Sequence, residues 1–77
     1  MSEPTWSERY GLIVAQNRRK LRLSQQALAG IAHVEVETVQ LIEAGGIAYV
    51  EEERAYLISR LLGLSDAVAW YAHQARH

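Results

Sequence analysis

The stretch SQQALAGIAHVEVETVQLIEAGG, Ser24 to Gly46, decides the fold because it holds two short helical patterns joined by a tight turn. Ser24 can cap a helix over residues 25–32, and a second helix over residues 35–44 stops at the pair Gly45-Gly46. The second pattern carries three glutamates and neither lysine nor arginine. The stretch therefore predicts a pair of helices, the second of which has an acidic surface.

The apolar residues keep a helical period outside this stretch as well. Thr5 and Glu8 have the spacing of a capping box, and the glutamates 51–53 suit the positive start of a later helix. Ser65 can cap a last helix, and residues 1–4 are expected to be flexible. The helices are predicted over about residues 6–21, 25–32, 35–44, 51–62 and 65–77.

The composition suits one small globular domain, expected over residues 5–77, because 49% of the 77 residues are apolar. There is no cysteine, which excludes disulfides and thiolate metal sites. No apolar run approaches the ~20 residues of a membrane span, and no signal-peptide pattern opens the sequence. We therefore expect an all-α, cytoplasmic protein with no membrane partner.

The charges are unevenly distributed, although the net charge is only −1. Four cations, Arg18, Arg19, Lys20 and Arg22, fall within five residues. Residues 33–53 contain six glutamates and neither lysine nor arginine. The domain is therefore expected to have one basic and one acidic patch.

Arg18 is followed by LSQQALA at 23–29, IEAG at 42–45 and LLGLS at 61–65. This order and spacing resemble the Cro/repressor-type helix-turn-helix family of bacterial and phage transcriptional regulators. The resemblance covers about residues 11–64 and implies a five-helix, lambda-repressor-like DNA-binding domain. It also implies a structural ion pair between Arg18, late in the first helix, and Glu43, late in the third.

The resemblance places Ala29 where the second and third helices cross, a position at which only a small side chain lets them approach. The side chains expected to seal this crossing are Leu28, Val39, Ile42, Leu61 and Leu64.

Two residues depart from the family pattern. His33 stands in the turn where the family usually has glycine, a position that favours a left-handed backbone. Glu35 stands where the family usually has Ser or Thr to cap the third helix, and its side chain is a poorer cap.

The family's base contacts come from the start of the second helix and the outward face of the third. Glutamine can bond to adenine and glutamate can accept from the cytosine amino group, while apolar side chains touch thymine methyls and arginine binds phosphate. The residues assigned to DNA on this basis are Arg22, Gln25, Gln26, Glu35, Val36, Glu37, Gln40 and Leu41.

The same surface fits a second function. Glutamates approach phosphates with the wrong sign, and Arg19, Lys20 and Arg22 suit the negative end of a helix without any DNA. Val36 and Leu41 within an acidic rim would form a docking patch for a basic protein. We expect a sequence-specific DNA-binding repressor, and the alternative is a helix-turn-helix module that binds protein.

The last predicted helix carries candidate dimer contacts at Val68, Trp70 and Tyr71. Trp70 and Tyr71 are adjacent and point about 100° apart, so one face of the helix cannot bury both. If one of them meets a second subunit, the resulting homodimer would read double-stranded DNA with a pseudo-palindromic sequence. Alternatively, both rings lie on the surface of a monomer.

Catalysis is not expected. His73 and His77 are four residues apart, but no third ligand of suitable spacing accompanies them, so no metal site is predicted. No phosphate-binding glycine loop, nucleophile elbow or paired-carboxylate site is visible, and no cofactor is expected.

Overall fold

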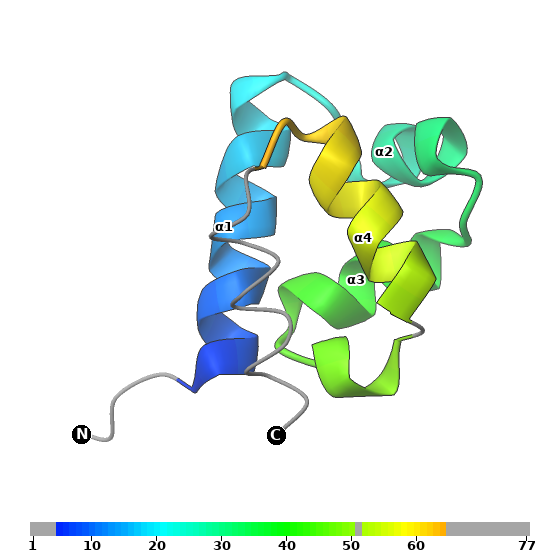
Figure 1. Ribbon diagram of the computed structural model, residues 1–77. Helices are drawn as coiled ribbons and strands as arrows, with labels where there is room; N and C mark the ends of the chain where they lie inside the picture. Colours follow the sequence, from blue (N-terminus) through cyan, green and yellow to red (C-terminus); the bar gives the residue numbers. More distant parts are fainter. Residues whose placement is uncertain (1–4, 51, 65–77) are drawn as a thin grey trace.

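The computed structural model describes residues 5–50 and 52–64, and within these residues the chain is helical and has no strand (Figure 1). The longest helix, α1, stands on one side of the molecule, and α4 lies between α1 and α2 in this view (Figure 1). The elements in chain order are α1 (Trp6–Lys20), α2 (Gln25–Ala32), α3 (Val36–Glu43), the 3-10 helix η1 (Ile47–Tyr49) and α4 (Glu52–Leu61).

The four α-helices agree with the sequence prediction to within one residue at each end. The sequence did not predict η1, which is a single turn without the repeat that marks a longer helix. The predicted helix over 65–77 and the predicted flexible residues 1–4 lie outside the described residues.

The helix starts follow the capping residues. Thr5 Oγ1 accepts from the Glu8 amide at 3.1 Å, and Ser24 Oγ accepts from the Ala27 amide at 3.0 Å. Glu35 precedes α3 without a side-chain capping bond, as expected for a glutamate at this position. The start of α3 is therefore less well satisfied than the starts of α1 and α2.

The four α-helices end in the same way. A residue with left-handed backbone follows each helix, and the amide of the next residue donates to the carbonyl five positions earlier. Gly45 and Gly63 are the left-handed residues after α3 and α4, with φ of 93° and 69°. Arg22 and His33 take the same place after α1 and α2, each with φ of 58°. The left-handed turn predicted at His33 is thus confirmed, whereas that at Arg22 was not predicted.

The core lies between α1, α2, α3, η1 and α4. Tyr10 of α1 is fully buried, and its hydroxyl donates to the Ala55 carbonyl at 3.2 Å and lies 2.5 Å from Ser59 Oγ, both on α4. The buried apolar residues of the core are Tyr10, Val14, Leu28, Ala29, Ala32, Val39, Ile42, Ile47, Val50, Ala55, Ile58 and Leu62.

One core prediction is wrong. Leu61 was expected to seal the helix crossing, but its side chain is 43% exposed, whereas its neighbour Leu62 is 7% exposed. On α4 the inward face is the one that carries Ala55, Ile58 and Leu62, and Leu61 points about 100° away from Leu62. The predicted burial of Leu28, Ala29, Val39 and Ile42 is confirmed, and Leu64 packs against the core in a half-buried position.

Candidate functional site

A polar cluster joins the end of α1, the start of α2 and the end of α3. Arg18 donates from Nε and Nη2 to the two carboxylate oxygens of Glu43, at 2.7 and 3.0 Å. Arg18 Nη1 donates to the Leu23 carbonyl at 2.8 Å, and Gln25 Nε2 donates to Glu43 at 3.1 Å. We call Arg18, Gln25 and Glu43 the clamp, because together they fix the positions of three helix ends.

The clamp is largely shielded from solvent, since the side chains of Arg18 and Glu43 are 11% and 8% exposed. The paired contact uses two parallel N–H bonds, which is the strong geometry for arginine and carboxylate. The contact predicted between Arg18 and Glu43 is therefore present. Gln25 as a third member was not predicted.

The hydrogen bond to Glu43 raises the pKa of the Arg18 guanidinium above its ordinary value; the charge of Glu43 adds to this effect and burial opposes it. Because the pKa of Arg18 is higher in the folded state than in the unfolded state, its protonation stabilises the fold. This stabilisation is complete below the ordinary pKa of arginine and is lost only as the pH rises through the pKa of the folded state. Arg18 therefore stays charged, and contributes a constant stabilisation, at every pH near neutrality.

A second structural requirement of this region is Gly11, which the sequence analysis missed. A Cβ at this position would lie 2.5 Å from the Ile42 carbonyl oxygen and 2.9 Å from that of Glu43. The backbone of α1 thus approaches the end of α3 closely at Gly11, about two helical turns before Arg18. A lone glycine within a helical pattern was the only available signal.

Six of the eight residues assigned to DNA are exposed to solvent. The acidic pair Glu35 and Glu37 stands at the start of α3, and no lysine or arginine lies on this helix. The exposed six are Arg22, Gln26, Glu35, Glu37, Gln40 and Leu41.

The other two assigned residues are half-buried. Val36 packs against the core, so it does not form one outward apolar patch with Leu41, and that part of the prediction is corrected. Gln25 commits one amide hydrogen to Glu43, so it acts within the clamp before it can contact anything else. The half-burial of Val36 and Gln25 depends on how the helices cross, and the spacing of residues along the sequence does not determine that.

The candidate dimer residues Val68, Trp70 and Tyr71 lie outside the described residues. Within the part of the chain that the structure describes, no group of three potential metal ligands comes together. No helix in that same part is long and apolar enough to cross a membrane.

Comparisons with protein-family models, with curated proteins and with solved structures found no match to this chain.

Proposed function

We propose that the chain is a small sequence-specific DNA-binding regulator, in which α2 and α3 act as a helix-turn-helix of the Cro/repressor type. In this proposal α3 enters the major groove, and the start of α2 lies over the DNA backbone. A homodimer formed through residues 65–77 would place two such units on a pseudo-palindromic operator and repress by occupying it.

The clamp is the observation that carries the proposal. A reading helix must be held within a narrow range of positions, because contacts to base edges have strict geometry. Arg18, Gln25 and Glu43 tie α3 to the start of α2 and the end of α1 from the inner side. Polar side chains such as Gln26, Glu37 and Gln40 remain exposed on these two helices.

Arg22 supplies a second argument. Its backbone is left-handed, which strains a residue with a side chain by about 1 kcal/mol. Glycine avoids this strain, and Gly45 and Gly63 stand at the equivalent ends of α3 and α4. Arg22 is exposed and stands three residues before Gln25, the first residue of α2, and the amides at a helix start that lack a partner can bind an anion. A phosphate bound by Arg22 and these amides would offset the strain.

The experiment uses the matched pair Arg22→Gly and His33→Gly, which make the same backbone change at equivalent helix ends. DNA duplexes are first selected from a random pool at ~50 mM salt, and affinity is then measured by fluorescence anisotropy over a salt series. We expect Arg22→Gly to weaken binding about fivefold and to reduce the salt slope by about 1, because one phosphate contact is lost. His33→Gly should change affinity by less than about twofold. An Arg22→Gly protein that keeps both the affinity and the salt slope contradicts the proposed role of Arg22.

A second candidate function follows from the charge of α3. Glu35 and Glu37 are exposed beside Leu41, and this surface suits a basic protein better than a phosphate backbone. If no duplex is selected even at about 50 µM protein, this candidate replaces the first. Leu41→Asp should then abolish capture of the protein partner and leave the helical content unchanged.

A further inference from the structure

Gly46, in the turn after α3, lies against the side chain of Leu41. A Cβ added at Gly46 would overlap Leu41 Cδ1 and would lie 2.8 Å from Leu41 Cγ and 3.1 Å from the Leu41 carbonyl oxygen. The backbone of Gly46 has φ of −96° and ψ of 28°, a conformation that residues with a side chain also adopt. Glycine is therefore needed at position 46 because Leu41 occupies the space, whereas at Gly45 the backbone, with φ of 93°, is the reason.

The other three α-helices end differently at the equivalent position. The amide that bonds back five residues belongs to Leu23 after α1, to Val34 after α2 and to Leu64 after α4. These three side chains pack against the core, which is the usual apolar contact at such a helix end. After α3 the equivalent residue is Gly46, whose amide donates to the Leu41 carbonyl at 2.8 Å, and the Leu41 side chain fills the space instead.

Leu41 stays on the surface although it fills this space. Its side chain is 38% exposed, and it shares the outward face of α3 with the exposed Glu37 and Gln40. The end of α3 thus holds an apolar side chain in a defined place on the face that the proposed function turns toward DNA.

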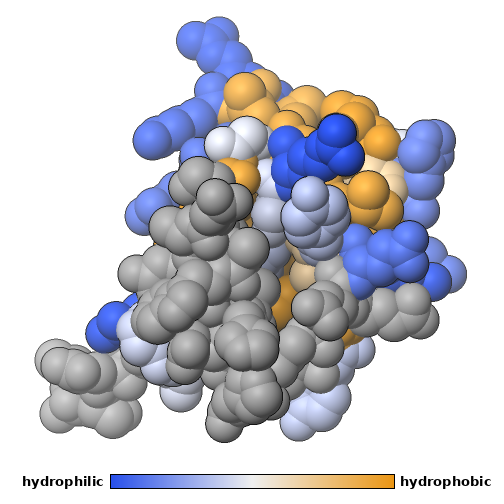
Figure 2. Space-filling model, viewed as in Figure 1, coloured by the Kyte–Doolittle hydropathy of each residue, from blue (hydrophilic) through white to orange (hydrophobic). Residues whose placement is uncertain are grey.

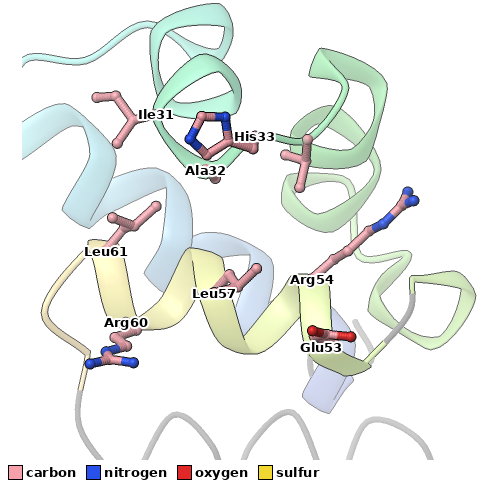
Figure 3. A pocket seen from close by; sticks show the side chains of 9 residues that line it. Ile31, Ala32, His33, Glu53, Arg54, Leu57, Arg60 and Leu61 are labelled. Carbon is pink, nitrogen blue, oxygen red and sulfur yellow. The ribbon is translucent and has the colours of Figure 1, made fainter.

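Exposed apolar side chains also line the open groove between α2 and α4, where Ile31 and Leu61 face each other (Figure 3). Figure 2 shows apolar surface on this side of the molecule, among hydrophilic side chains. A Cβ added at Gly30 in α2, or at Gly63 after α4, would meet nothing within 4 Å, so neither glycine makes room for a side chain of the groove. Leu41 differs from the groove residues because a glycine provides its place.

We infer that Gly46 is a positioning residue, which holds Leu41 in one orientation so that Leu41 contacts the methyl group of a thymine in the major groove. The inference rests on the proposed DNA-binding function. An isobutyl group forms no hydrogen bond with a base edge or a phosphate, and the thymine C5 methyl is the apolar group that the major groove presents. A side chain that is already held in one orientation also loses less conformational entropy when it makes a contact.

The first test measures the orientation of Leu41 in the full chain without DNA, from the ¹³C chemical shifts of its methyl groups. Gly46→Ala should change these shifts, because Cγ and Cδ1 of Leu41 must move. The urea midpoint should move by less than about 0.3 M, since a flexible side chain gives way more easily than backbone. Gly30→Ala, the same change where nothing is near, should leave the Leu41 shifts as they are. Unchanged Leu41 shifts in Gly46→Ala would overturn the positioning role.

The second test replaces thymine by uracil, which lacks the methyl group, at each position in turn of a duplex selected at ~50 mM salt. One replacement should weaken binding of the unmodified chain about fourfold, as expected for one buried methyl group. Leu41→Ala and Gly46→Ala should each reduce this factor below about twofold, whereas Gly30→Ala should keep it. The salt slope should be the same for all of them, because no phosphate contact is lost.

The double variant Leu41→Ala/Gly46→Ala shows whether the two residues act through one contact. Alanine at position 41 lacks Cγ and Cδ1, so Gly46→Ala should have no further effect on the preference for thymine in that background. A thymine preference that survives Leu41→Ala, or uracil without effect at every position, overturns the thymine contact while DNA binding stands. A preference that survives Gly46→Ala overturns the role of Gly46. If no duplex is selected even at about 50 µM protein, the proposed function fails and the thymine contact with it, and the Leu41 shifts alone decide whether Gly46 positions Leu41.

Discussion

The α1–α3 contact and the α2–α4 contact show two different uses of a helix surface. Where α1 meets α3, Gly11 brings the backbones together and the Arg18–Glu43 pair closes the far end in a nearly solvent-free position. Where α2 meets α4, large apolar side chains such as Ile31 and Leu61 remain about half exposed on both sides of an open groove. The first contact holds α3 in place on α1, and the second leaves apolar side chains exposed to solvent.

The largest expected effect comes from breaking the clamp at the α1–α3 contact. Glu43→Ala leaves the Arg18 guanidinium buried with only the Leu23 carbonyl as a partner and removes the acceptor of Gln25. We expect a loss of about 3 kcal/mol in the free energy of unfolding, measured by urea denaturation.

The double variant Arg18→Met/Glu43→Leu is the control. It removes both charges and fills the space with apolar atoms, so it should be more stable than Glu43→Ala even though it lacks the ion pair. If Glu43→Ala leaves the free energy of unfolding unchanged, or if the double variant is the less stable of the two, then Glu43 does not stabilise the fold by neutralising the buried charge of Arg18.

Gly11→Ala is the second test of the same contact. The added Cβ would lie 2.5 Å from a backbone oxygen of α3, which cannot rotate away, so α1 and α3 must separate. After a gain of about 1 kcal/mol in helix propensity, we expect a net loss of about 2 kcal/mol in unfolding free energy, because backbone shifts in a packed core are costly. An unchanged denaturation midpoint would mean that the two helices are not in close contact.

The difference between the two contacts also separates what the sequence predicts from what it does not. Helix starts at Thr5 and Ser24 were predictable, because a cap bonds to an amide three residues away and needs no distant partner. The Arg18–Glu43 contact was predicted from resemblance to a family, since no local rule joins residues 25 positions apart.

The rotation of α4 and the groove were not predictable in the same way. Leu61 continues the helical spacing of Leu57, and Leu62 continues that of Ala55 and Ile58, so the packing of α4 on the other helices decides which leucine is buried. Likewise, the half-burial of Val36 and the bond from Gln25 to Glu43 depend on how α1, α2 and α3 cross. The Arg18–Glu43 contact was therefore accessible from the sequence, whereas the bond from Gln25 to Glu43 and the half-burial of Val36 were not.

Gly30→Ala is the control for Gly11→Ala, because it makes the same change outside the α1–α3 contact. Gly30 lies in α2 and is exposed, and a Cβ added there would meet nothing within 4 Å. We expect a gain of about 0.5–1 kcal/mol in unfolding free energy from helix propensity alone. The opposite signs at Gly11 and Gly30 in parallel denaturation curves would separate close backbone contact from propensity, and a destabilised Gly30→Ala would place an unseen contact on this side of α2.

The smallest effect on stability is expected in the groove itself, with Leu61→Gln. Its side chain is 43% exposed, and glutamine keeps the methylene groups that lie along α4, so the free energy of unfolding should fall by no more than about 0.5 kcal/mol. Leu62→Gln, one residue later and 7% exposed, makes the same chemical change in the core and should cost about 3 kcal/mol. If the two variants unfold at the same urea concentration, α4 is rotated from the position described, and Leu61 belongs to the core rather than to the groove. If they differ as expected, the exposed Leu61 adds little to the fold, and α4 faces the core with Leu62.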